Sequence, residues 1–427
     1  MKLTKWLNRT VITLVTFISL TSTTIGQNLP ELSLEEAQRL AREHYPALKQ
    51  KNFIKQAEEV SISNLNKGFL PQISINGQAT YQSEVTSITI PIPGINIDPP
   101  SKDQYKATTD INQLLFDGGV IRQQKKIQKL SSQTEAQRTE VELYQLRERV
   151  DQIYLTILLL EQQQKQISLI YKDLQTGIAK VLAQVQNGTA FRSNLDVLKA
   201  ELLKTDQRSV ELESSREGLL NTLSVLTGTD LNAETKFAIP PTPVIGDSIQ
   251  RPELDLYEKQ EQLLNQQKKL VAAKNLPKAS LFGQGGYGRP GLNFLKDEFD
   301  WFYIAGAKLT WNLSSLYTAK AEKKLIDLNK NGVEVQKETF LINTQSQLKQ
   351  QLAEIKKLKQ LIISDETIIS LREKVKMASR AQLESGVITA NDYLREVNAE
   401  DQARQSRIIH QMQVLQAQIN YQHLTGF

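Results

Sequence analysis

Reactive side chains are scarce in this chain of 427 residues. It contains no cysteine, which excludes disulfides, thiolate catalysis and Cys-ligated metals. Its only histidines are His44, His410 and His423, and we interpret each as a partly exposed helix residue rather than a base or a ligand. No pair of carboxylates stands in a recognisable catalytic context. The sequence therefore predicts a protein that is not an enzyme, with no catalytic residue, metal site or cofactor.

One motif could bind a phosphate, because Gly283 to Gly288, "GQGGYG", satisfies the pattern G-x-G-x-x-G. In dinucleotide-binding proteins such glycines follow a strand and open a helix whose N-terminus faces the pyrophosphate. Here the motif runs from a predicted strand into a loop that contains Pro290. The motif fails this test of context, and we expect its glycines to let a strand bend.

The strand around this motif alternates in character and occurs twice. In "PQISINGQATY" (71–81), Ile73, Ile75 and Tyr81 share one face, and polar residues occupy the other. The related "PKASLFGQGGY" (277–287) follows 206 residues later. A further alternating strand comes after each copy, at 105–116 and 301–313. Alternation of this kind predicts strands with one apolar and one polar face.

Aromatic residues gather where these strands meet their loops and again near the far ends of the strands. They are Tyr81, Tyr105, Phe116, Tyr287, Trp301, Tyr303 and Trp311. Apolar strand faces with an aromatic girdle at each end are typical of outer-membrane barrels. A soluble sandwich would explain the alternation but not the two aromatic bands. Four strands are too few for a barrel of useful bore, whereas three subunits would supply twelve.

The repeat extends over most of the chain. Pro46 and Pro252 are separated by 206 residues, whereas Gly188 and Gly386 are separated by 198. A deletion of eight residues within the Pro-rich loop after Tyr81 reconciles the two offsets. We predict a first repeat at 27–228, with a β-hairpin at about 70–117 and a helical hairpin that turns near 188. A linker at 229–250 leads to a second repeat at 251–427, with a β-hairpin at about 277–313 and a turn near 386.

Residues 1–26 are predicted to be a secretory signal peptide. Lys2, Lys5 and Arg9 precede an apolar run at 11–20 and the small residues of "TSTTIG". The alternative to a signal peptide is a membrane-spanning helical anchor, but the run is too short for one. Without these three cations, 49 basic residues face 47 acidic ones, and the net charge falls from +5 to +2. Since no basic patch is interleaved with aromatic residues, we expect no nucleic-acid partner.

Long helices are predicted to follow the strands. A shorter helix opens the first repeat at 33–50, where Ser33 and Glu36 have the spacing of a capping box. Apolar residues then recur at heptad spacing through each long region. The positions are Leu143, Leu146, Val150, Ile153, Ile157, Leu160, Ile167, Tyr171, Leu174, Ile178, Val181 and Val185 in the first repeat, and Leu341, Leu348, Ile355, Ile362 and Ile369 in the second. A coiled-coil hairpin with no transport role would show the same spacing.

The order of these segments resembles the TolC family of outer-membrane efflux proteins across essentially the whole mature chain. The resemblance is carried by "LSLEEAQRLAREHYPAL", "LPQISINGQATY", "INQLLFDGG", "NGTAFRSNLDVLKAE", "QRPEL" and "SGVITANDYL", in that order. It implies a mixed α and transmembrane β subunit that gives four strands to a trimeric twelve-stranded barrel. It also implies a periplasmic α-helical tunnel, and as partners a periplasmic adaptor, an inner-membrane exporter and outer-membrane lipids.

The resemblance also assigns candidate residues. Asp392, Arg395 and Glu396, with Asp196 in the first repeat, correspond by position to residues that line the periplasmic aperture. Because Arg395 departs from a second acidic ring, strong cation selectivity is not implied. Two glycines and their neighbours correspond to the tips that meet the adaptor; the residues are Asn187, Gly188, Thr189, Ser385, Gly386 and Val387.

Two functions follow from these patterns. The favoured one is a passive exit duct in the outer membrane that extends into the periplasm and belongs to a tripartite efflux or secretion system. The alternative is a periplasmic structural coiled coil without channel activity.

Overall fold

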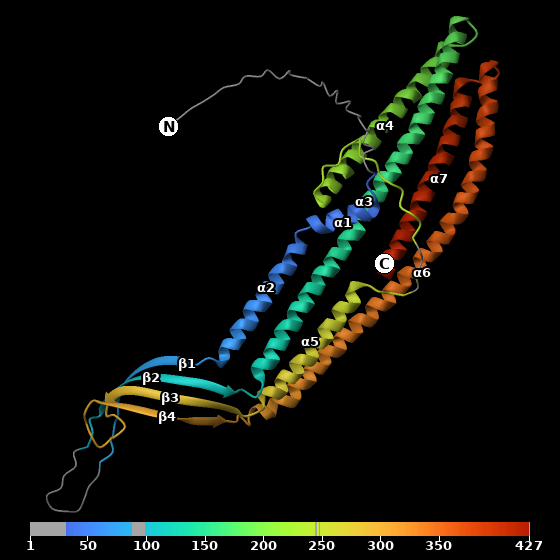
Figure 1. Cartoon of the computed structure of the whole chain (residues 1–427). Helices are drawn as coiled ribbons and strands as arrows, with labels where there is room; N and C mark the ends of the chain where they lie inside the picture. Colours follow the sequence, from blue (N-terminus) through green and yellow to red (C-terminus); the bar gives the residue numbers. More distant parts are fainter. Residues whose placement is uncertain (1–30, 88–98, 244–245, 247, 427) are drawn as a thin grey trace, which may run out of the picture.

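The computed structural model describes residues 31–87, 99–243, 246 and 248–426. The predicted signal peptide and much of the Pro-rich loop after the first strand lie outside these residues. Two long helical hairpins extend from one side of a small sheet (Figure 1). The elements are α1 (Leu34–His44), α2 (Ala47–Asn66), η1 (Lys67–Phe69), β1 (Gln72–Tyr81), β2 (Asp103–Phe116), α3 (Val120–Gln186), α4 (Arg192–Thr227), α5 (Pro252–Lys274), β3 (Lys278–Arg289), β4 (Asp300–Thr310), α6 (Ser315–Glu384) and α7 (Ala390–Thr425).

The sheet is antiparallel in the order β1-β2-β3-β4, so the two repeats meet at the β2–β3 pair. Ile73 pairs with Ile111, Ile111 with Gly283, and Gly283 with Ala305. Up to a β-bulge between Leu114 and Phe116, this register places the odd-numbered residues of all four strands on one face, because side chains alternate along each strand. That face carries the predicted apolar residues, such as Ile75, whose exposed fraction is 82%. β1 and β4 have no second partner strand within the described chain.

The even-numbered face of the sheet is mainly polar and is ordered by one carboxylate. Asp110 accepts hydrogen bonds from Gln284 Nε2 at 2.6 Å, Asn76 Nδ2 at 2.5 Å and Thr108 Oγ1 at 3.3 Å. These bonds link three neighbouring strands at one level. The carboxylate therefore fixes its neighbours instead of lying free on this face.

The glycine-rich motif lies inside β3 and opens no helix. A Cβ at Gly286 would come within 2.8 Å of both the Phe302 ring and the carbonyl oxygen of Ala107. Gly306 gives similar room to the ring of Phe282. The close approach of a ring and a neighbouring strand explains Gly286 better than strand bending, the role that the sequence suggested.

Four helices leave the sheet in the order of its strands, with α2, α3, α5 and α6 packed side by side (Figure 1). Asp117 fixes the passage from β2 to α3. Its buried carboxylate accepts the amide protons of Gly119 at 2.7 Å and Ile121 at 2.5 Å. Gly118 and Gly119 have φ of 75° and 82°, which a glycine adopts without strain. This turn sets the direction in which α3 leaves the sheet.

The opening helix is broken where one continuous helix was expected. α1 ends at His44, the following Tyr45 has an extended ψ of 127°, and α2 starts after Pro46. A residue before proline disfavours the helical region, which explains the break. Ser33 does cap α1, accepting the amide proton of Glu36 at 3.1 Å. The Glu36 carboxylate instead pairs with Arg39 at 2.6 Å, so the reciprocal half of the expected box is replaced by an ion pair.

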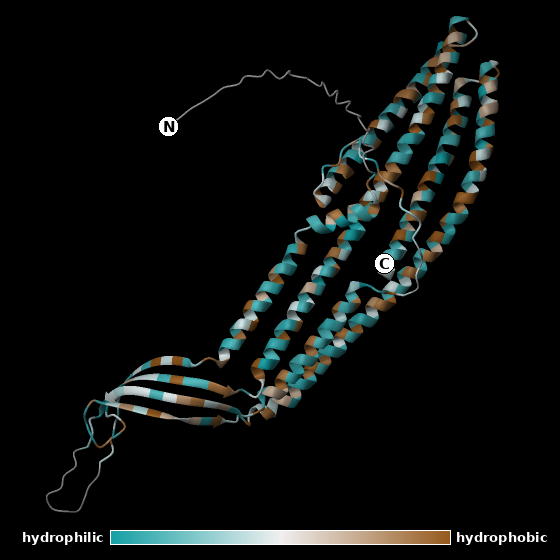
Figure 2. Cartoon of the chain, in the orientation of Figure 1, coloured by the Kyte–Doolittle hydropathy of each residue, from teal (hydrophilic) through white to brown (hydrophobic). Residues whose placement is uncertain are grey.

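The predicted heptad seams are largely buried. Leu143, Leu146, Val150 and Leu174 of α3 are among the buried residues. In the second repeat, Leu348, Ile355 and Ile369 of α6 are likewise buried. Apolar residues nevertheless remain scattered over the outer surfaces of the helices (Figure 2). None of the described helices is long and apolar enough to cross a membrane.

Candidate functional site at the helix turns

The turns at the far ends of the two hairpins share one backbone conformation. In the first, the amide of Gly188 donates to Val185 O at 3.1 Å and that of Thr189 donates to Gln184 O at 2.9 Å. The two equivalent bonds of the second turn measure 3.0 and 2.9 Å. This pair of bonds is the Schellman motif, in which a left-handed residue ends a helix. Gly188 and Gly386 supply that residue, with φ of 73° and 71°.

All six predicted tip residues are exposed at these turns. A Cβ at either glycine would meet no atom within 4 Å. Val387 and Phe191 are 71% and 81% exposed, which is unusual for large apolar side chains. The turns therefore present small, apolar surfaces whose shape depends on backbone conformation.

The residues after the turns differ between the repeats. α7 starts with a complete capping box, in which Thr389 Oγ1 accepts from the Asp392 amide at 3.3 Å and Asp392 Oδ2 accepts from the Thr389 amide at 3.1 Å. Thr389 Oγ1 also donates to Asp392 Oδ2 at 2.7 Å. α4 starts after Phe191, whose side chain has no hydrogen-bonding group that could cap the helix. Only the second turn fixes an anion at its helix start.

The hydrogen bonds from Thr389 hold the pKa of Asp392 below its usual range, and Arg395 adds to this effect. Asp392 is therefore ionised at neutral pH. Arg395 itself is 74% exposed, and its Nε lies 3.2 Å from Glu396 Oε1. Glu396 is only 15% exposed and also pairs with Arg372 of α6 at 3.4 Å. Among the predicted aperture residues, Glu396 joins α6 to α7, whereas Asp392 and Arg395 lie nearer the solvent.

Asp196 is exposed near the start of α4 and makes no ion pair with a described residue. With the offset of 198 residues, its counterpart is Leu394, which is buried. The counterpart of Asp392 is Asn194. Asp196 and Asp392 thus occupy different helical positions relative to their turns.

The structure brings the two hairpins together around a shared core near the turns. Buried residues of both repeats form it; they are Ile170, Leu174, Val181, Leu195, Leu198, Leu383, Ala390, Tyr393, Leu394 and Val397. Gln184 Nε2 donates to the carbonyls of Leu383 and Glu384, each at 3.1 Å. Lys180 also pairs with Glu384. These contacts hold the end of α6 against α3.

A second set of polar contacts lies farther along the hairpins. Lys376 Nζ lies 2.9 Å from Asp173 Oδ2 of α3 and 3.3 Å from Glu400 Oε2 of α7. Burial lowers the pKa of Lys376, but these two carboxylates outweigh it and leave the pKa raised. Asp401 Oδ2 of α7 similarly pairs with Arg208 Nη1 of α4, at 3.1 Å. Sequence reasoning missed these residues, since partners that are distant in the chain leave no spacing signal.

At the opposite end of the molecule, the predicted aromatic residues lie at both ends of the strands. All seven are at least 41% exposed; they are Tyr81, Tyr105, Phe116, Tyr287, Trp301, Tyr303 and Trp311. Tyr287 pairs across the sheet with Trp301, and their ring centroids are 5.0 Å apart. The exposed rings therefore lie at two levels of the sheet, and their role as a membrane girdle stays a prediction.

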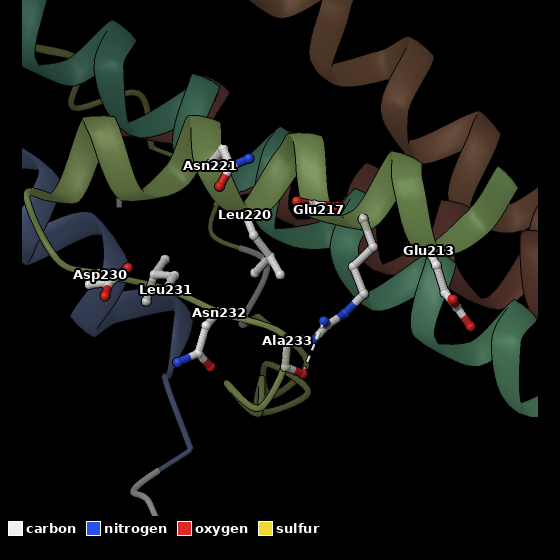
Figure 3. A pocket seen from close by; sticks show the side chains of 9 residues that line it. Glu213, Glu217, Leu220, Asn221, Asp230, Leu231, Asn232 and Ala233 are labelled. Carbon is white, nitrogen blue, oxygen red and sulfur yellow. Dashed lines mark hydrogen bonds between the residues drawn. The ribbon is translucent and has the colours of Figure 1, made fainter. Parts of the chain in front are cut away.

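A hollow of about 500 Å³ separates α4 from the start of the linker (Figure 3). Arg216 at its wall binds Glu161 at 2.8 Å and the carbonyls of Ala233 and Thr235 at 3.2 and 3.0 Å. These bonds attach the linker to the helices, and we assign the hollow a structural role. No group of acidic or histidine side chains suited to a metal ion occurs in the described part of the chain.

Comparison with known proteins agrees with this geometry. Residues 38–229 match the family model described as outer membrane efflux protein. These residues belong to that family. The match covers most of the first repeat, and over these residues it confirms the resemblance stated from the sequence. No curated protein matches the chain in sequence.

Solved structures extend the likeness to nearly the whole chain. It is similar to a crystal structure of CusC, studied for transmembrane channel formation, with a TM-score of 0.68, 14% identity and coverage of 92% of each chain. The Campylobacter jejuni CmeC outer membrane channel is similar with a TM-score of 0.65 and 15% identity, and the match covers 92% of this chain and 85% of that one. The Vibrio cholerae outer membrane protein VceC is similar with a TM-score of 0.66 and 14% identity, and the match covers 92% of this chain and 96% of that one. At such identities the likeness shows the subunit fold.

Proposed function

We propose that three copies of this efflux protein close into an exit duct, with a twelve-stranded barrel in the outer membrane and a helical tunnel in the periplasm. The family match and the channel fold support an outer-membrane efflux role. The observation that carries closure into a ring is the pair of subunit edges that lack a partner within the described residues, and twelve strands from three copies suffice for a barrel. β1, α2 and α4 lie along one edge, and β4 and α6 lie along the other.

Both edges carry exposed apolar residues at heptad spacing. On α6 they are Leu328, Val335 and Ile342, followed by Leu361, Ile368 and Val375. The other edge has Phe53 and Val60 on α2, and Leu203 and Val210 on α4. Residues seven apart on a long helix form a seam for a second helix. The α6 stripe of one copy fits against α2 and α4 of the next.

Since the two edges differ, this contact is heterologous, and such a contact closes into a ring when the rotation between neighbouring copies is one third of a turn. The same ring would pair the β4 edge of one copy with the β1 edge of its neighbour. α3 is 67 residues long, or roughly 100 Å at 1.5 Å per residue. The turns would therefore stand far from the membrane, where a periplasmic adaptor and an inner-membrane exporter meet them. Cargo passes through without being converted.

Val335→Glu tests the closure directly. A charge in the α6 seam should reduce the trimer to monomer, as measured by the mass of the detergent-solubilised protein and by its loss from the outer-membrane fraction. Lys337→Glu, two residues away on the same helix, is the matched control and should leave the trimer intact. A monomeric wild-type protein in the soluble periplasmic fraction would instead favour the structural coiled coil.

A further inference from the structure

The face of the sheet that lines the proposed duct carries few charges, and they are unevenly placed. The apolar odd-numbered residues face lipid in a barrel, so the even-numbered face lines the lumen. Lys278 and Lys308 lie on this lumen face at the end of the sheet nearest the helices. Lys278 pairs with Thr310, and Lys308 with Ser280. The two lysines are thus on adjacent strands, two residues apart in register.

Both lysines are exposed, and neither makes an ion pair with any residue in the described ranges. The nearest carboxylate of the strands on this face is Asp110, which pairs with Gln284, four residues along β3 from Ser280. Four residues of strand span about 13 Å. This exceeds the Debye length of about 8 Å at physiological ionic strength. Asp110 is therefore too far from the lysines to compensate their charge.

Three copies would place six such lysines around the base of the barrel. Rings of one charge raise the local concentration of the opposite ion, and basic rings are characteristic of anion pores. We propose that Lys278 and Lys308 form a lysine ring at the junction of barrel and tunnel, and that this ring selects anionic cargo. The proposal rests on the duct proposed above and specifies its cargo class. It also gives the duct a positive barrel base opposite a turn region that bears Asp392.

The test uses the purified full-length mature trimer in a planar bilayer, with inorganic tripolyphosphate added to the side of the strand loops. Tripolyphosphate should block the current of the wild type. Its half-blocking concentration should rise at least tenfold in Lys278→Gln/Lys308→Gln and return to the wild-type value in Lys278→Arg/Lys308→Arg. If both proteins conduct and tripolyphosphate blocks the wild type and the Gln variant at equal concentrations, the lysine ring is overturned but the duct is not. Absence of current from a folded wild-type trimer would contradict the duct itself, and the lysine ring with it.

Discussion

The two helix turns have the same backbone but different chemistry. Gly188 and Gly386 end α3 and α6 in the same left-handed conformation and with the same pair of hydrogen bonds. Beyond them, the second turn has the Thr389–Asp392 capping box, whereas the first has only exposed Phe191. The duplication has therefore kept the residue that determines chain reversal and changed the residues that face outward. We infer that the second turn carries the gate and that the first supports it.

The substitution Gly386→Trp is expected to have the largest effect, which is a loss of export. The left-handed conformation costs a non-glycine residue roughly 1–2 kcal/mol, too little to unfold the protein, and the surrounding space is open. The indole would obstruct the surface that meets the adaptor, so export should be abolished while the trimer persists. Cargo accumulation in cells and the mass of the purified oligomer measure the two effects.

Gly386→Ala is the control for strain without bulk and should retain most of the export. Gly188→Trp makes the comparison between the turns and should impair export less. Loss of the trimer in Gly386→Trp would count against a role confined to the tip.

Lys376→Met should have the next largest effect, because it removes one of the polar contacts between the hairpins. Asp173 and the buried Glu400 would lose their shared ammonium partner. Hydrogen bonds to charged groups contribute about 1.5–3 kcal/mol, so we expect destabilisation of about 2 kcal/mol. Thermal unfolding followed by helical circular dichroism measures it. Lys374→Met, at an exposed position two residues away, should change stability by less than about 0.5 kcal/mol; an equal effect of both variants would refute the assignment.

The capping difference predicts opposite effects at the two turns. Thr389→Ala removes the cap of α7 and should destabilise the protein by about 1 kcal/mol. Phe191→Ser introduces a capping hydroxyl at the start of α4 and should stabilise it by up to about 1 kcal/mol. The same unfolding measurement compares them. Two changes of the same sign would show that the caps are not what distinguishes the turns.

The smallest effect concerns pH. Thr389 holds the pKa of Asp392 below its usual range, so the folded state favours the ionised carboxylate. The resulting stabilisation is complete above the unfolded pKa of about 3.9 and is lost as the pH falls through the lower folded pKa. The difference in Tm between wild type and Asp392→Asn should be constant from pH 8 to pH 5 and should shrink below about pH 4. A difference that persists at pH 2 would exclude the carboxylate as its cause.

Local patterns predicted much of the fold. The alternation around Ile73 and Ile75 indicated which strand face is apolar, because the period of two is a property of each strand by itself. The heptads of α3 and α6 indicated the buried seams for the same reason. The break before Pro46 was missed although proline is visible in the sequence, since the helical pattern on both sides suggested one continuous helix.

The candidate site was less accessible to prediction. The positions of Gly188 and Gly386 followed from the repeat, but the partners of Asp392 did not. Its bonds with Thr389 depend on where α7 begins, and helix boundaries are poorly determined by propensity. The Lys376 contacts join three helices that only tertiary packing brings together. The roles of Asp392, Arg395 and Glu396 at an aperture remain predictions. Asp196 was also a candidate, but its counterpart in the second repeat is the buried Leu394 and not Asp392, and we expect it to contribute less.

Single-channel conductance of the purified mature trimer tests the central claim most directly, with Asp392→Ala measured beside it and Asp196→Ala as the matched control. We predict discrete small current steps in the wild type, larger steps or altered ion selectivity in Asp392→Ala, and little change in Asp196→Ala. Folded trimers that carry no current in any of the three proteins would contradict the duct and favour a structural coiled coil.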